Sequence, residues 1–235
     1  MPHRVASQYV NDAILLFDYD GTVRLGSEHA THYARLVAAE LEPEDERAFL
    51  AAHAAFVAGK PTTASTFDAF DADNAVRRLA GEFGVPDAAR AAAYEATRER
   101  MAAGDFAVWA PEGFAEFIWS LPRSVEVHLV TNAPEATLEP VLDRLGLDGL
   151  FDRVVGDAAK PVGLERMLDD LLEDRKPERI LSVGDIPVND LAPAADRGCP
   201  TAYIDHYGRP WPRATATGRS VEDLYGFIHR WATEG

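Results

Sequence analysis

The sequence predicts an α/β protein, built as a doubly wound parallel sheet with a helical domain inserted after the first strand. From residue 111 onward, short β-branched and aliphatic runs alternate with amphipathic segments, as in parallel sheets. Between about residues 23 and 107, helical segments follow one another without a strand. We therefore expect a core of residues 1–22 and 108–235 and an inserted helical domain of residues 23–107.

The first strand is the apolar run 13–17, which ends in an acidic loop. Prolines and acidic residues then mark helix starts, and glycines mark helix ends. The remaining expected elements are helices 27–41, 43–58, 66–83, 86–103 and 111–121, strand 125–130, helix 134–145, strand 153–155, helix 161–174, strand 180–183, helix 188–197, strand 201–204 and helix 221–231.

Composition narrows the expected partners. The 235 residues are 47% hydrophobic, enough for a substantial core, and the net charge of -16 offers no basic surface for nucleic acid or an anionic membrane. The single cysteine, Cys199, fits a reducing cytoplasm. No apolar run approaches 18 residues, and the first residues lack a signal peptide's apolar stretch. We expect a cytoplasmic protein with a small-molecule partner, and its oligomeric state stays open.

Polar residues follow four of the expected strands. Because the carboxyl ends of parallel strands lie at one edge of a sheet, these residues should converge there. The carboxylates of Asp18 and Asp20 repel each other, so a cation should lie near them, and Mg²⁺ prefers oxygen ligands. The alternative is a surface turn with an aspartate at each end. Together the residues supply what phosphoryl transfer needs: a nucleophile, a metal site, a cation and hydrogen-bond donors. They are Asp18 and Asp20, Thr131 and Asn132, Lys160, and Asp185 and Asp190.

These residues, in this order, resemble the four motifs of the haloacid dehalogenase superfamily. The first motif, DxDGT, matches residues 18–22, and the fourth, GDxxxxD, matches residues 184–190. Between them, Thr131 matches the second motif and Lys160, followed by proline, matches the third. The helical insert falls where this superfamily carries a C1-type cap, as phosphoglycolate phosphatases and β-phosphoglucomutases do.

The resemblance implies a role for each aspartate. Asp18 would attack phosphorus and carry the phosphoryl group as an aspartyl-phosphate. Asp20 would protonate the leaving oxygen and then activate water, and its backbone carbonyl would also bind the metal. Asp185 would be a further Mg²⁺ ligand, with Asp190 orienting the site from behind it or through water. A helix-start acid remains the alternative for Asp190.

The resemblance also assigns the neighbouring polar residues. Thr131 and the Asn132 amide would donate to the phosphoryl oxygens, and Lys160 would neutralise charge on Asp18 and on the transferring group. Thr131 could equally cap the helix that follows it, and Lys160 could be a solvated lysine before a helix-opening proline. Only three lysines occur in the chain, which adds weight to Lys160 falling on the third motif.

Asp20 favours phosphate ester chemistry. Dehalogenases have no oxygen leaving group that an acid would need to protonate, and they generally lack this second aspartate. The function expected is a Mg²⁺-dependent phosphatase acting on a small phosphorylated metabolite. Two alternatives stay open: a phosphomutase of the β-phosphoglucomutase type, and a non-catalytic protein that binds a phosphorylated metabolite.

Two basic residues are further substrate-binding candidates. Lys60 lies in the most polar non-helical stretch of the insert and could meet a second anionic group of the substrate, with an exposed loop lysine as the alternative. Arg24 follows the first motif at the entrance to the insert. The segment 206–209, which contains His206 and Arg209, should lie on the same sheet edge as the motifs, without an assigned role.

Overall fold

The computed structural model describes residues 13–234. The chain divides into two compact units: unit 1 comprises residues 1–25 and 109–235, and unit 2 comprises residues 26–108. No helix among the described residues is long and apolar enough to cross a membrane.

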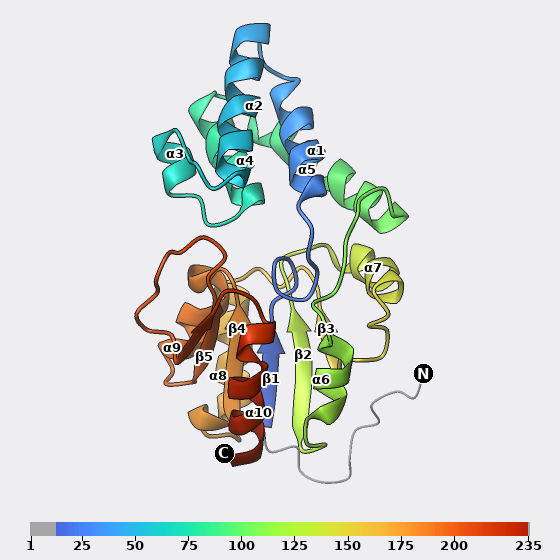
Figure 1. The fold of residues 1–235 in the computed structure, drawn as a ribbon, viewed down its shortest axis with the longest axis vertical. Coiled ribbons are helices and arrows are strands. Elements are labelled where there is room, and N and C mark those ends of the chain that lie inside the picture. Colours follow the sequence, from blue (N-terminus) through green and yellow to red (C-terminus); the bar gives the residue numbers. More distant parts are fainter. Residues whose placement is uncertain (1–12, 235) are drawn as a thin grey trace. The chain divides into compact units, whose positions relative to one another are not determined.

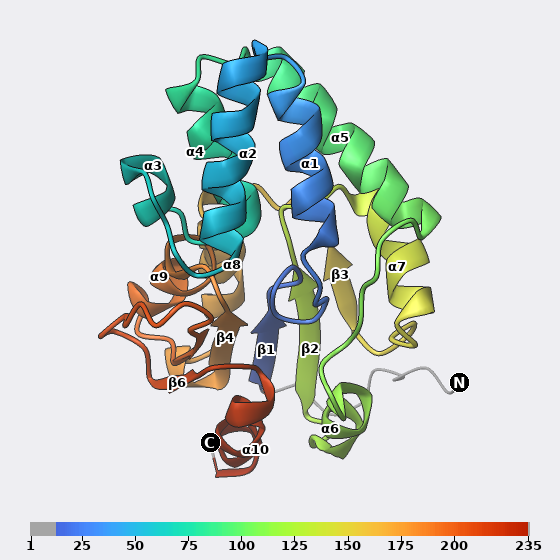
Figure 2. The ribbon, with the colours of Figure 1, turned by 45° about the horizontal axis from the view of Figure 1, so that its top comes forward.

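Unit 1 is built on one six-stranded sheet in which every neighbouring pair of strands is parallel. The arrows of β1 and β2 point to the same edge in both views (Figure 1, Figure 2). The order is β3-β2-β1-β4-β5-β6, so the chain proceeds outward in both directions from β1 and β4, and the predicted α/β fold is confirmed. The strands are β1 (Ala13–Phe17), β2 (Val125–Val130), β3 (Arg153–Val155), β4 (Ile180–Gly184), β5 (Thr201–Ile204) and β6 (Ala216–Gly218).

The alternation of side chains along β1 supplies apolar surface to both faces of the sheet. Leu16 belongs to a buried cluster with Leu168 of α8 (Val162–Leu172). Phe17 instead meets the ring of Phe114 from α6 (Phe114–Ser120), with ring centroids 5.3 Å apart. All five residues of β1 are buried, which explains why this strand reads as a continuous apolar run. The loop that follows β1 therefore starts from a rigid base.

The remaining helical segments of unit 1 connect or flank the strands. One turn, at Pro187–Leu191, is a π-helix that directly follows the loop after β4. The others are α7 (Leu138–Arg144), α9 (Ala192–Ala195), α10 (Tyr225–Glu234) and the 3₁₀ turns Glu135–Thr137, Pro177–Arg179 and Glu222–Leu224.

Unit 2 is helical throughout its regular structure and has its own apolar core. The core includes Tyr33, Val37, Phe49 and Leu79, all with no exposed surface. Buried members of this cluster recur at helical spacing, as at Tyr33 and Val37, so the helices that form it turn an apolar face inward. The helices are α1 (Glu28–Ala38), α2 (Pro43–Val57), α3 (Ala64–Phe67), α4 (Ala72–Glu82) and α5 (Asp87–Ala103).

Two sequence-based expectations about elements are wrong. The single helix expected at 66–83 is two helices, because Thr63 caps α3 and Asp71 starts α4 by accepting a hydrogen bond from Asn74 N at 2.5 Å. The short edge strand β6 was not expected, because its sequence, Ala-Thr-Gly, carries little strand signal.

Candidate active site

The motif residues gather where β1 and β4 lie side by side at the centre of the sheet. The strand order reverses direction between these two strands, which is where open α/β sheets bind ligands. Asp18 directly follows β1, and its backbone N–H continues the strand pairing by donating to Val183 O of β4 at 2.9 Å. Asp185 directly follows β4, so the two carboxylates leave neighbouring strands at the same edge.

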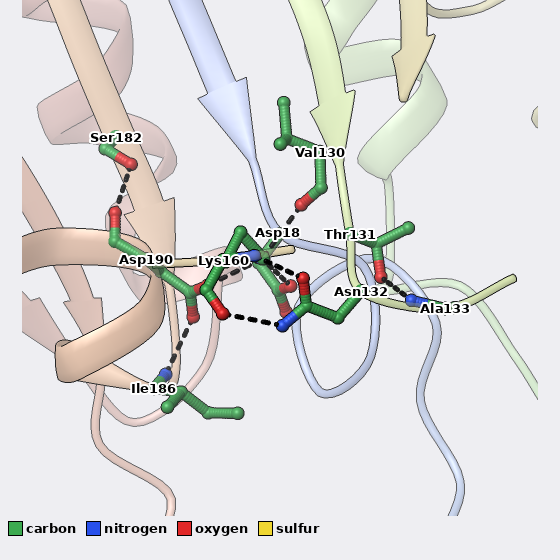
Figure 3. A network of polar contacts seen from close by, with 9 residues as sticks. All are labelled: Asp18, Val130, Thr131, Asn132, Ala133, Lys160, Ser182, Ile186 and Asp190. Atoms are coloured by element: carbon green, nitrogen blue, oxygen red, sulfur yellow. Dashed lines mark hydrogen bonds and ion pairs between the residues drawn. The ribbon is translucent and has the colours of Figure 1, made fainter. Parts of the chain in front are cut away.

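A buried lysine joins the loop after β1, the end of β2 and the π-helix Pro187–Leu191 (Figure 3). Lys160 Nζ donates to Asp18 Oδ1 at 2.6 Å, to Asp190 Oδ1 at 2.6 Å and to Val130 O at 2.9 Å. The side chains of Lys160 and Asp190 are each 3% exposed, and that of Asp18 is 7% exposed. An ammonium group has three hydrogens, so these contacts use all of its donors.

The shared ammonium leaves the carboxylates short of positive charge. Burial and the charge of Asp190 together raise the pKa of Asp18 to about 7, although the Lys160 ammonium acts to lower it. Burial alone would lower the pKa of Lys160, but Asp18 and Asp190 outweigh burial and shift this pKa upward. Lys160 is therefore charged throughout the physiological range, and the site still carries uncompensated negative charge whenever its aspartates are ionised.

Asp190 is held from several directions. Its Oδ2 accepts a hydrogen bond from Ile186 N at 2.9 Å, while Oδ1 accepts from Lys160. Its backbone carbonyl accepts from Ser182 Oγ of β4 at 2.6 Å. The Asp190 side chain can pack this close to the main chain of β4 because residue 184 is glycine: a Cβ at position 184 would lie 2.5 Å from Asp190 side-chain atoms. Since both carboxylate oxygens already have partners, the arrangement suits Asp190 to orient the site.

The donor set fits a hard divalent cation. Carboxylate oxygens of Asp18, Asp185 and Asp190 lie within 4.8 Å of one another, and all three residues are buried. Asp18 Oδ2 is buried and has no hydrogen-bond partner among the described residues. Three carboxylates beside one lysine leave a net negative charge in a poorly hydrated place, which a cation such as Mg²⁺ would neutralise with the oxygen ligands it prefers.

Asp20 lies just beyond this group of carboxylates, and its side chain is held by Arg24. Arg24 Nε donates to Asp20 Oδ1 at 2.6 Å, and the Arg24 side chain is 2% exposed. The turn between them is closed by Val23 and Arg24 N–H groups, which both donate to Tyr19 O at 2.8 Å. Arg24, a substrate-binding candidate from the sequence, is therefore placed against Asp20.

Thr131 and Asn132 follow β2 and are both engaged locally. Thr131 Oγ1 accepts from Ala133 N at 3.1 Å, which closes a local turn and does not cap the 3₁₀ turn that begins at Glu135, and its hydroxyl hydrogen remains able to donate. The Asn132 side chain pairs with the backbone of Lys160 in both directions: Oδ1 accepts from Lys160 N at 2.6 Å, and Nδ2 donates to Lys160 O at 3.1 Å. Asn132 thus fixes the main chain that carries the lysine.

Of the remaining residues considered from the sequence, Lys60 lies in a different part of the chain from His206 and Arg209. Lys60 belongs to unit 2, where it is exposed after the end of α2, and its role stays a prediction. His206 lies after β5, and its Nε2 is 2.8 Å from Gly21 O. Sequence reasoning assigned His206 no role, because no motif contains it, and its position directly after a strand was the one available signal.

The comparisons with known proteins identify the family of this chain. Residues 13–198 match the model of the haloacid dehalogenase-like hydrolases, so the chain belongs to that family. No curated protein matches the chain significantly.

Several solved structures share the fold. The HAD hydrolase YfnB of Bacillus subtilis, bound to magnesium, is 21% identical with a TM-score of 0.60, over 92% of this chain and 98% of that one. CbbY of Rhodobacter sphaeroides, in complex with phosphate, is 19% identical with a TM-score of 0.61, over 91% and 96%. An L-2-haloacid dehalogenase is 18% identical with a TM-score of 0.56, over 92% and 98%. At these identities the likeness is one of fold.

Proposed function

We propose that this protein is a Mg²⁺-dependent phosphatase that hydrolyses a small phosphate monoester through an aspartyl-phosphate. The observation that carries the proposal is the Asp18 carboxylate, which Lys160 holds by Oδ1 while Oδ2 has no hydrogen-bond partner among the described residues. Held at a strand end, Asp18 has one oxygen fixed and one with its lone pairs available. That is how a carboxylate nucleophile must be presented.

Asp20 supports phosphate esters over carbon–halogen bonds. A departing alkoxide needs a proton, whereas a departing halide does not, so an acid two residues after the nucleophile is useful only for an oxygen leaving group. Arg24 holds Asp20 by Oδ1, and we assign proton transfer to Oδ2. The dehalogenase among the structural neighbours shares the fold, and this second aspartate argues for a different reaction.

In the first half-reaction, Asp18 attacks phosphorus, the ester P–O bond breaks, and Asp20 gives its proton to the leaving oxygen. In the second, Asp20 takes a proton from water, water attacks the aspartyl-phosphate, and inorganic phosphate leaves with Asp18 restored. Lys160 balances the charge of Asp18 in both steps. Thr131 and the Asn132 backbone amide are the proposed donors to the phosphoryl oxygens.

Mg²⁺, when bound, would neutralise the phosphoryl oxygens and hold them in line with Asp18. Asp18 and Asp185, with the backbone carbonyl of Asp20, are the proposed ligands. Asp190 would not bind the metal directly but would orient the site through its hydrogen bonds from Lys160 Nζ and Ile186 N. We propose unit 2 as the cap that selects the substrate, with Lys60 as a contact for a second anionic group.

Phosphate release from a panel of phosphorylated metabolites tests this function. We expect release with Mg²⁺, none after metal stripping in EDTA, and none from Asp18→Asn, which keeps the size of the side chain but loses the nucleophile. Sugar phosphates in the panel should yield free phosphate, without conversion to an isomeric phosphate. Full activity of the metal-stripped protein, or of Asp18→Asn, would contradict the proposal.

A further inference from the structure

His206 connects the loop after β5 to the turn of the first motif. Its Nε2 lies 2.8 Å from the carbonyl oxygen of Gly21, a residue 185 positions away in the chain. A carbonyl can only accept, so Nε2 carries the hydrogen and donates it. The same nitrogen lies 3.7 Å from Asp185 Oδ2. One imidazole thus faces both the turn after β1 and the carboxylate after β4.

The turn that His206 contacts is held by hydrogen bonds within the turn and by one hydrogen bond from outside it. On the inner side, Gly21 N donates to Arg24 O at 2.9 Å, and Val23 N donates to Tyr19 O at 2.8 Å. On the outer side, the carbonyl of Gly21 accepts from His206. Gly21 directly follows Asp20, so a displacement of this carbonyl moves the Asp20 main chain as well.

The space between the turn and Asp185 is small. Gly21 has a φ of 85°, which favours glycine, and a Cβ at this position would collide with Asp185 Oδ2. A shift of the turn toward β4 is therefore blocked by Asp185. A shift in the opposite direction is what the His206 hydrogen bond resists, because it ties Gly21 to the loop after β5.

We propose that His206 is a positioning residue for the metal site, which holds the Asp20 main chain at a fixed distance from Asp185. The proposal rests on the proposed function in so far as these residues bind Mg²⁺. The side chain of His206 is 29% exposed, and its loop follows a strand whose four residues are all buried. An imidazole with two rotatable bonds on such a base loses little freedom by making this contact.

Hydrogen exchange of the metal-free protein tests the attachment itself. His206→Ala should accelerate exchange of the backbone amides of residues 21–24 about fivefold, the factor expected for one lost hydrogen bond. His206→Gln should stay near wild type, since its Nε2 can reach the carbonyl, whereas the shorter His206→Asn should behave like alanine. His229→Ala, on the exposed face of α10, is the matched control. Unchanged exchange in His206→Ala would overturn the proposal.

Direct Mg²⁺ titration by calorimetry tests the consequence. Loss of an outer partner of a metal site typically weakens affinity about 10–100-fold, and we expect the lower end for His206→Ala and His206→Asn. His206→Gln and His229→Ala should stay within about threefold of wild type. If wild type binds Mg²⁺ and His206→Ala binds it equally well, the positioning role is wrong. If wild type binds no Mg²⁺, the proposed function and the metal role fail together, while the exchange result still decides whether His206 holds the turn.

Discussion

Replacing Lys160 by methionine should destabilise unit 1 by an amount that depends on pH. The substitution keeps a long apolar stem but removes the ammonium that contacts Asp18 and Asp190, each at 2.6 Å. Both carboxylates lie in a site less than a tenth exposed, so water cannot replace the lost cation without rearrangement. The Val130 carbonyl loses its donor at the same time.

The expected loss is about 3–5 kcal/mol at pH 8, the usual cost of removing one partner from a buried ion pair. Its pH dependence follows from Asp18, whose pKa burial already raises to about 7 with Lys160 present. Without the ammonium, the pKa of Asp18 in the folded state should rise further above its value in the unfolded chain. Relative to wild type, the stability of the variant should therefore fall as pH rises above about 7, where Asp18 of the wild type ionises, and recover as pH is lowered.

Urea unfolding in EDTA, followed by tryptophan fluorescence, measures this loss. All four tryptophans lie in unit 1, so the signal reports on the unit that contains the site. Lys176→Met, at an exposed position before a 3₁₀ turn, is the control and should change stability by less than about 0.5 kcal/mol. A loss below about 1 kcal/mol at pH 8, or one that is the same at pH 5.5, would refute the view that Lys160 compensates buried charge.

Three further predictions concern the chemistry and its support. Asp20→Asn should lose about 10²–10⁴-fold in kcat with an alkyl phosphate but much less with p-nitrophenyl phosphate, and equal losses would remove Asp20 as the leaving-group acid. Asn132→Ala should lower kcat about tenfold, because Lys160 loses both side-chain contacts to its backbone; an unchanged kcat would show that the lysine is placed without them. In wild type without metal, the raised pKa of Asp18 means that the folded state binds the extra proton between about pH 4 and 7. Thermal denaturation should therefore show the metal-free protein losing stability as the pH is raised from about 4 to 7, and stabilisation by Mg²⁺ should grow over the same rise in pH.

Local pattern was enough to predict the architecture, because periodicity and motif spacing are properties of neighbouring residues. The buried run of β1 and the strand–helix alternation after residue 111 both follow from side-chain spacing along the chain. The same reasoning failed where the signal was weak or interrupted. The strand β6 is three residues long, and Asp71 divides an otherwise continuous helical pattern by capping a new helix.

Residue types and spacing also selected Asp18, Lys160 and Asp185 as members of one site, because parallel strands bring their carboxyl ends to a common edge. Which oxygen contacts which nitrogen required the tertiary structure. Only the folded chain shows Lys160 shared by two aspartates, or His206 reaching Gly21. These contacts join residues 30 to 185 positions apart, and their geometry depends on how loops from separate strands pack, which no local pattern encodes.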